Sequence, residues 1–263
     1  MCIRDRSRQG NYRDFDIMNS FLRVFIFVFS TIAVSQVVAD EAIDQLKNSL
    51  AKRLPQFEVS YIDKTPIEGI YQVIIGGQVI YMTKDARYMI DGNLVDLATK
   101  KNYSEDAMSV IRLSQLDKLG EDKMVVYTPE TIKHTITVVT DIDCPYCRRL
   151  HSEMDQYMAG GVQVRYIFMP LKGQGDYRTT VSVWCAKDQN EALDLAKAGA
   201  EMEAKDCDNP IDEHLKISRS LGVRGTPAII LQDGSMLPGY VPANKLIAEL
   251  ASLNLSTAKT EKH

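Results

Sequence analysis

Residues 135–151 read Thr135-Ile-Thr-Val-Val-Thr-Asp-Ile-Asp-Cys144-Pro-Tyr-Cys147-Arg-Arg-Leu-His151, a short apolar segment that runs directly into two closely spaced cysteines. The β-branched residues Ile136, Val138 and Val139 are typical of a buried β-strand. Pro145 is favoured at the first position of a helix, where its missing N–H group costs nothing and its φ angle already suits the helix. The pattern therefore predicts a strand, a turn, and a helix that opens at the cysteines.

Cys144 is then the N-cap of this helix, and its sulfur faces backbone N–H groups at the positive end of the helix dipole. Such surroundings stabilise a thiolate, so we expect a lowered pKa for the Cys144 thiol. Cys147 follows one turn later, more deeply placed but still able to form a disulfide with Cys144. We predict a catalytic pair in which Cys144 is the nucleophile and Cys147 the resolving thiol.

A zinc site and a purely structural disulfide are the two other interpretations of this spacing. A four-cysteine zinc site needs a second close pair, whereas Cys185 and Cys207 stand far apart in the chain. A strand that leads into Cys-x-x-Cys at the start of a helix is typical of redox-active dithiols. We therefore expect neither a metal nor another cofactor.

The segment before residue 40 is predicted to be a leader. Residues 18–39 combine a basic start, an apolar centre and small residues at Val37 and Ala39, which suit cleavage before Asp40. A membrane anchor is the alternative, but the apolar run is short for a span. The polar residues 1–17 are interpreted as an upstream artefact. The mature chain would keep four of the five cysteines, an even number, in an oxidising compartment.

The composition is that of an ordinary globular protein. The 263 residues suffice for one large domain or two small ones, and 45% of them are hydrophobic. The net charge is −4 and no basic face stands out, so nucleic acid is not an expected partner.

The first part of the mature chain, residues 40–103, is predicted to be a small antiparallel sheet with one helix. An apolar stripe predicts the helix over residues 40–54. A strand is expected over 57–62, followed by two hairpins, one built from 70–75 and 79–82 and the other from 88–90 and 94–97. A domain of this size is marginal alone, so pairing with a second copy through a sheet edge is plausible.

A helix over residues 104–119 follows, with Ser104 as the expected N-cap and Gly120 as its end. An ordinary surface helix is one interpretation. We favour a linker helix, residues 104–122, between two domains.

The second domain, residues 123–263, continues with a strand over 162–169, which together with the first strand and its helix gives a right-handed βαβ unit. A helical insertion follows and is bracketed by Cys185 and Cys207. In an oxidising compartment these two are expected to form a structural disulfide, and two buried thiols are the alternative. Trp184 is expected in the core.

Thr226 and Pro227 open the next apolar strand, which is unusual because proline cannot donate to a sheet ladder. A cis bond at a functional edge would explain the pair, and the backbone there could hold an extended substrate peptide. A hairpin over 236–241 and a closing helix over 245–253 are expected beyond it. His151 is interpreted as a half-exposed helix residue, and Arg148 and Arg149 as solvated rather than catalytic.

The order of these motifs resembles the bacterial periplasmic disulfide isomerase family DsbC/DsbG, with a thioredoxin-like second domain. The resemblance runs from about Asp40 to Leu253 and is carried by residues 140–147, 184–188, 221–228 and 237–240. It implies an α+β protein, with a cystatin-like dimerisation domain joined by a linker helix to a thioredoxin-like α/β domain that has a helical insertion.

The resemblance also implies partners and roles. It implies a V-shaped homodimer, a membrane reductase of the DsbD type that keeps Cys144 and Cys147 reduced, and misfolded disulfide-containing secreted proteins as substrates. Pro145 and Tyr146 are expected to tune the dithiol. DsbC members usually carry Gly where Pro145 stands and DsbG members carry Cys-Pro-Tyr-Cys, whereas a second cysteine pair is typical of DsbC.

The predicted activity is therefore isomerisation or reduction of wrong disulfides in the periplasm, by a protein closest to DsbC. A DsbG-like reductase or chaperone and a dithiol oxidase of the same compartment are the alternatives.

Overall fold

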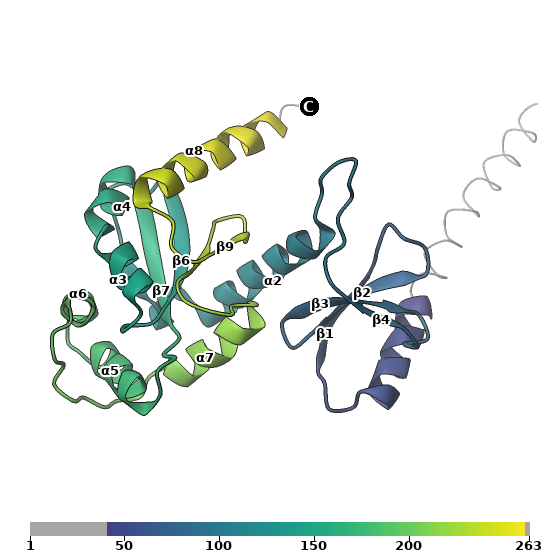
Figure 1. Cartoon of the computed structure of the whole chain (residues 1–263), viewed down its shortest axis with the longest axis horizontal. Helices are drawn as coiled ribbons and strands as arrows, with labels where there is room; N and C mark the ends of the chain where they lie inside the picture. The colour runs from purple at the N-terminus through teal and green to yellow at the C-terminus, as the bar shows by residue number, and fades with distance from the viewer. Residues whose placement is uncertain (1–40, 261–263) are drawn as a thin grey trace, which may run out of the picture. The chain divides into compact units, whose positions relative to one another are not determined.

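The computed structural model describes residues 41–260, with side chains as far as Leu253 apart from that of Ser60 (Figure 1). The predicted leader, residues 1–39, lies outside this range. Two compact units can be distinguished, and residues from 91 onward belong to the second. Within the described range, none of the helices combines the length and the apolar character needed to cross a membrane.

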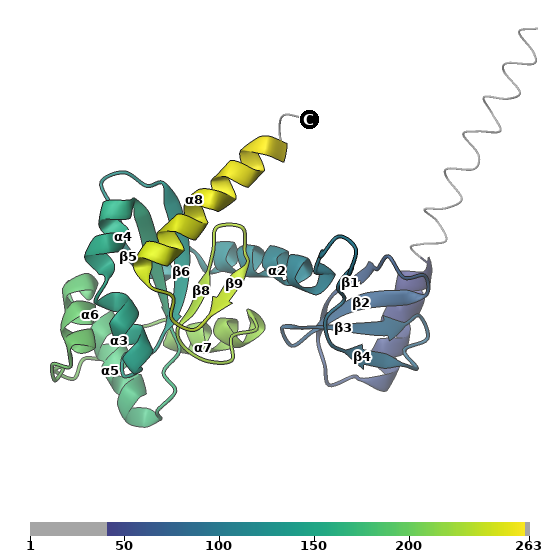
Figure 2. The ribbon, with the colours of Figure 1, turned by 45° about the horizontal axis from the view of Figure 1, so that its top comes forward.

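The first unit is a four-stranded antiparallel-type sheet with one helix on it (Figure 2). The helix over residues 41–53 follows the predicted apolar stripe, and Leu46 and Leu50 are fully buried. The strands keep their sequence order across the sheet: β1 (Val59–Lys64), β2 (Ile70–Ile75), β3 (Gln78–Thr83) and β4 (Met89–Asp91). The first predicted hairpin is therefore correct.

The second predicted hairpin is wrong in its second strand. β4 lies beside β3, and residues 94–97 form only an isolated bridge between Val95 and Asn102. The Asp-Gly-Asn sequence predicts a hairpin turn, but the chain leaves the sheet there. β4 is thus an edge strand, and all three of its residues are exposed.

Helix α2 (Tyr103–Leu119) begins earlier than expected. Its N-cap is Asn102, whose side chain accepts the Glu105 N–H group, whereas the predicted cap Ser104 accepts the Leu94 N–H group. Leu116 and Leu119 are buried in the core of the second unit. The helix predicted as a linker therefore packs on the second unit along its C-terminal half.

The second unit is built on a five-stranded sheet in the order β5-β7-β6-β8-β9. The parallel pairing of β6 and β7 confirms the predicted βαβ unit, and the antiparallel β8–β9 pair confirms the last hairpin. The strands are β5 (Val125–Tyr127), β6 (His134–Thr140), β7 (Val162–Phe168), β8 (Ala228–Ile230) and β9 (Met236–Pro238). Strand β5 was not predicted.

Successive side chains of β6 point to opposite faces of this sheet and so pack into two apolar clusters, one on each face. Ile136 and Val138 enter the larger cluster, and Val139 enters the smaller one, which α2 and α7 help to cover. Figure 1 shows α3, α4 and α8 on one side of the sheet and α2 and α7 on the other. The helices of this unit are the short η1 (Glu121–Lys123), α3 (Pro145–His151), α4 (Met154–Gly160), α5 (Gln174–Trp184), α6 (Gln189–Ala198), α7 (Ile211–Ser220) and α8 (Ala243–Thr260).

The helical insertion is closed by a disulfide between Cys185 and Cys207, whose Cα atoms are 5.8 Å apart. Cys185 follows directly after α5, and the segment that ends at Cys207 carries α6. Trp184 packs at the border of the larger cluster, with its ring at right angles to that of His214. The bridge therefore holds α6 in a closed loop against the core.

Candidate active site

The turn between β6 and α3 is fixed by Asp141, which is 2% exposed. One carboxylate oxygen accepts the Asp143 N–H group at 2.8 Å, and the other accepts the Leu171 N–H group at 3.2 Å. A buried aspartate that bonds the backbone two residues onward is a common way to shape a tight turn. The turn places Cys144 at the N-cap of α3 and Pro145 at the first helical position, as the sequence predicts.

Cys144 is a partly exposed thiol whose Sγ lies 3.4 Å from the Thr226 carbonyl oxygen. Partial burial acts to raise the pKa of this thiol. The backbone N–H group of Cys147, the Thr226 side chain and the Cys147 thiol outweigh it with hydrogen bonds, so the pKa is lowered overall. The thiolate is the form that attacks a disulfide, and Cys144 is the thiol placed to form it.

Cys147 is a buried thiol, 1% exposed. Burial raises its pKa, although the charge of Lys197, the Asp141 N–H group and the Thr140 hydroxyl act in the opposite direction. The same surroundings therefore push the two thiol pKa values apart. The partly exposed thiol is therefore the more readily ionised of the two, and the buried thiol the less readily ionised.

Thr226 and Pro227 lie directly before β8, next to Cys144, and the peptide bond between them is cis. Pro227 is buried, and its carbonyl accepts the Gly239 N–H group at 2.8 Å. The structure thus brings together four of the predicted site residues from two distant parts of the chain. Tyr146, between the cysteines, is 61% exposed and stands at the surface beside Cys144.

The interpretation of His151 as half-exposed is wrong, because it is 8% exposed. Its Nε2 donates to the Asp194 carboxylate at 2.8 Å, and its Nδ1 lies 3.1 Å from the Tyr166 hydroxyl. Burial lowers the pKa of His151, against the opposing effect of Asp194. Arg148 is partly exposed as expected, and its guanidinium is tied to Asp143 and to the Ile142 carbonyl.

Lys197 on α6 is a site residue that sequence reasoning missed. It is 5% exposed, and its Nζ donates to Thr140 Oγ1 at 2.7 Å and to the Asp141 carbonyl at 2.8 Å. The signal was available, because Lys197 falls on the apolar stripe of α6, four residues after Leu193. A lysine on a buried stripe needs a partner inside the protein.

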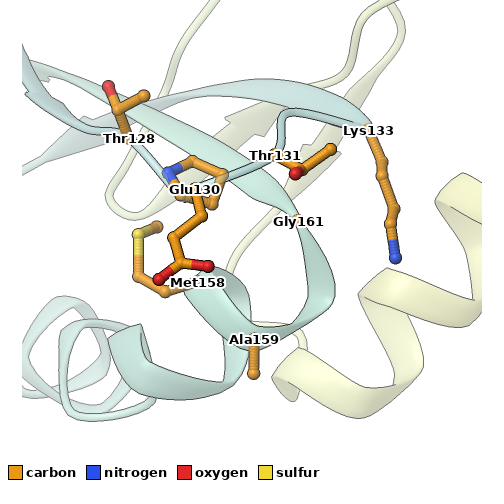
Figure 3. A pocket seen from close by; sticks show the side chains of 8 residues that line it. Thr128, Glu130, Thr131, Lys133, Met158, Ala159 and Gly161 are labelled. Atoms are coloured by element: carbon orange, nitrogen blue, oxygen red, sulfur yellow. The ribbon is translucent and has the colours of Figure 1, made fainter.

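A separate hollow of about 590 Å³ opens between the loop after β5 and the end of α4 (Figure 3). None of its lining residues is a predicted site residue; they are Thr128, Pro129, Glu130, Thr131, Lys133, Met158, Ala159 and Gly161. Exchange between sulfur atoms needs an accessible thiol rather than an enclosed cavity, so we place the chemistry at Cys144. Within residues 41–260, no three His, Cys, Asp or Glu side chains are arranged to hold a metal ion.

Comparison with known families matches both units. Residues 36–105 match the model of the disulfide bond isomerase protein N-terminal domain, and residues 121–254 match that of the thioredoxin-like domain. The α+β plan predicted from the sequence is confirmed, with an antiparallel-sheet domain followed by a thioredoxin-like one.

Curated relatives resemble the chain over most of its length. The thiol:disulfide interchange protein DsbC of Dickeya dadantii is 36% identical over 232 residues, which cover 87% of this chain and 94% of that protein. DsbC of Salmonella typhimurium is 39% identical over 204 residues, 77% of this chain and 83% of that protein. Among solved structures, a disulfide interchange protein from Neisseria gonorrhoeae is 28% identical and covers 49% of this chain and 96% of that one, with a TM-score of 0.45.

Proposed function

The chain belongs to the DsbC family and is a thiol:disulfide interchange protein, and from this premise we propose that it isomerises wrong disulfides of periplasmic proteins with Cys144 as its nucleophile. The observation that carries the proposal is the contrast between the two thiols. Cys144 is accessible and has a lowered pKa, while Cys147 is buried and has a raised one.

The reaction begins when the Cys144 thiolate attacks one sulfur of a substrate disulfide. A bond forms between Cys144 Sγ and that sulfur, and the other substrate sulfur leaves as a thiolate. This thiolate then attacks a different disulfide of the substrate, and the chain of exchanges ends when a substrate thiolate displaces Cys144. The substrate keeps its number of disulfides but changes their pairing.

When no substrate thiolate returns, Cys147 completes the cycle. Its thiolate attacks Cys144 Sγ, the two cysteines form a disulfide, and the substrate leaves reduced. The enzyme then needs two electrons, and a membrane reductase of the DsbD type is the proposed donor. Pro145 and Tyr146 set how readily the dithiol gives up these electrons.

Thr226 and Pro227 are proposed to hold the substrate backbone beside Cys144. Support comes from the Thr226 carbonyl, which lies against Cys144 Sγ, and from the exposed neighbours Arg224 and Gly225. An extended peptide that pairs with this segment would bring its own sulfur to Cys144.

The N-terminal domain is proposed to join two copies into a homodimer. Support comes from β4, an exposed edge strand that carries Met89 and Ile90 at 59% and 54% exposure, with Tyr88 at 58% beside it. An apolar, unpaired edge is a template for pairing with another strand. Residues 18–39 are proposed to direct the chain to the periplasm and to be removed there.

The redox state of the dithiol in its native compartment tests this function. Cells are quenched in acid, thiols are alkylated with a mass tag, and the protein is resolved on a gel. A mostly reduced Cys144–Cys147 pair is expected for an isomerase that a membrane donor maintains. A mostly oxidised pair would contradict it and favour a dithiol oxidase.

A chaperone that holds unfolded chains without redox chemistry is the alternative from another class. The variant Cys144→Ala/Cys147→Ala separates the two, with Cys144→Ala alone as the matched variant. We expect both to lose the recovery of activity from a protein with scrambled disulfides. Full recovery with the double variant would overturn the proposed mechanism.

A further inference from the structure

Lys197 is the buried cation behind the dithiol, and the turn that carries the cysteines holds its ammonium group. The Thr140 hydroxyl and the Asp141 carbonyl both accept from Nζ. The lysine comes from α6, inside the loop that the Cys185–Cys207 disulfide closes. Removing an ammonium group from water is unfavourable, so a buried lysine beside a dithiol indicates a functional role.

The same two residues also act on Cys147. The Thr140 side chain and the Asp141 backbone both favour the ionised form of the Cys147 thiol and so lower its pKa, against the larger effect of burial. A threonine hydroxyl can donate one hydrogen bond and accept others at once. One hydroxyl therefore lies between the buried thiol and the buried amine.

We propose that Lys197, in its neutral amine form, accepts the proton of Cys147 through the Thr140 hydroxyl when Cys147 attacks a mixed disulfide on Cys144. This inference rests on the proposed function and deepens its second half. The Cys147 proton passes to Thr140 Oγ1 while the hydroxyl proton passes to Nζ, so the hydroxyl ends unchanged. Lys197 is then a positioning residue that acts through Thr140.

The rest of the step involves only Cys147, Cys144 and the substrate sulfur. The Cys147 thiolate forms a bond with Cys144 Sγ, and the bond from Cys144 to the substrate sulfur breaks. Its electron pair leaves on the substrate sulfur, so the two cysteines are oxidised and the substrate disulfide is reduced. The proton on Lys197 returns to the departing thiolate or to water.

The charges around Lys197 suit a proton acceptor. Burial lowers the pKa of Lys197 to about 8, while Cys147, Asp141 and Cys144 raise it and Arg148 lowers it further. His151, on α3, is close enough for the lysine to lower its pKa in turn. In a mixed disulfide the Cys144 sulfur carries no charge. The support that its thiolate gives to the ammonium form is then lost, so the neutral amine becomes more available when Cys147 must lose its proton.

Stopped-flow reaction of the reduced, full-length protein with dithionitrobenzoate separates the two thiols. Attack by Cys144 releases a first coloured thiolate, and attack by Cys147 on the resulting mixed disulfide releases a second. In Lys197→Met we expect the second release to slow about tenfold or more near neutral pH, with its pH profile moved to higher pH, and the first to change little.

Lys197→Arg is the matched variant, since arginine keeps the charge but does not give up its proton. We expect its second release to be as slow as that of Lys197→Met. A second release at the wild-type rate in Lys197→Arg would show a purely electrostatic role and overturn the proposal.

Thr140→Val and Thr140→Ser test the relay with Lys197 in place, and they keep the proposal open to refutation if the lysine variants do not fold. The second release should be slow in Thr140→Val and restored in Thr140→Ser. If the second release in Thr140→Val kept the wild-type rate and pH profile, proton transfer through Thr140 would be refuted, while the proposed function would stand. Loss of the first release in the wild-type protein would instead refute Cys144 as the nucleophile.

Discussion

Removal of the Cys185–Cys207 disulfide should destabilise the second domain by an amount that the chain itself sets. The two cysteines are 22 residues apart. In the chain-entropy model, closing a loop of this length removes entropy from the unfolded chain equivalent to about 3.4 kcal/mol at room temperature. Cys207 is exposed and Cys185 only half-buried, so Cys185→Ala/Cys207→Ala leaves little cavity to add to this loss.

The assay is urea unfolding followed by fluorescence of Trp184, the only tryptophan in the chain. Trp184 reports on the second domain because this side chain packs beside Cys185 at the border of the larger cluster. With a typical denaturant slope of about 2 kcal/mol per molar urea, the midpoint should fall by roughly 1.7 M.

Asp208→Ala, at an exposed position just outside the closed loop, is the control and should keep the wild-type midpoint. The wild-type protein unfolded with a reductant should match the double variant, because Cys144 and Cys147 are already thiols. A midpoint within about 0.3 M of the oxidised wild type would refute the loop-entropy reasoning.

Three further predictions concern stability and assembly. Burial lowers the pKa of His214 to about 4 from 6.5, so the stability contributed by its neutral form is complete above about pH 6.5 and is lost as the pH falls through about 4. The free energy of unfolding, measured in urea, should therefore fall with decreasing pH by up to about 3 kcal/mol more in the wild type than in His214→Gln. Parallel curves of unfolding free energy against pH would contradict this. Arg112→Met should cost about 3 kcal/mol in the same assay, because the Leu221 and Gly234 carbonyls lose a buried charged donor; an unchanged midpoint would refute that role. Ile90→Lys should convert the proposed dimer to a monomer in sedimentation while exchange with dithionitrobenzoate continues, and a dimer that persists would exclude β4 as the interface.

The centre of the second domain could be predicted because its signals are local. The β-branched run of β6, the proline at the first position of α3 and the second strand β7 are each encoded within a few residues. Thr226 and Pro227 were also visible, since a proline before an apolar strand is rare enough to mark a special site.

The features that escaped depend on residues far apart in the chain. Residues 94–97 leave the sheet and form only an isolated bridge between Val95 and Asn102, which the local turn signal does not report. Arg112 is buried with two of its acceptors, the Leu221 and Gly234 carbonyls, more than a hundred residues away in the chain. His151 is buried because Asp194 of α6, in the insertion, packs against it, and its own segment does not show this.

The dithiol of an isomerase must meet two opposing requirements, because Cys147 has to attack slowly enough for the substrate to rearrange and yet release substrates that stall. The surroundings of Cys147 serve both. An ionised, exposed Cys147 would attack each mixed disulfide at once, and every encounter would end in reduction before the substrate could rearrange. Burial raises the pKa of Cys147 and so delays this attack. If Cys147 never attacked, stalled substrates would stay bound to Cys144. The proton path from Cys147 through Thr140 to Lys197 therefore sets the rate of this attack. The interval available for rearrangement is thus determined by a lysine on α6 rather than by the four residues of the Cys-Pro-Tyr-Cys motif alone.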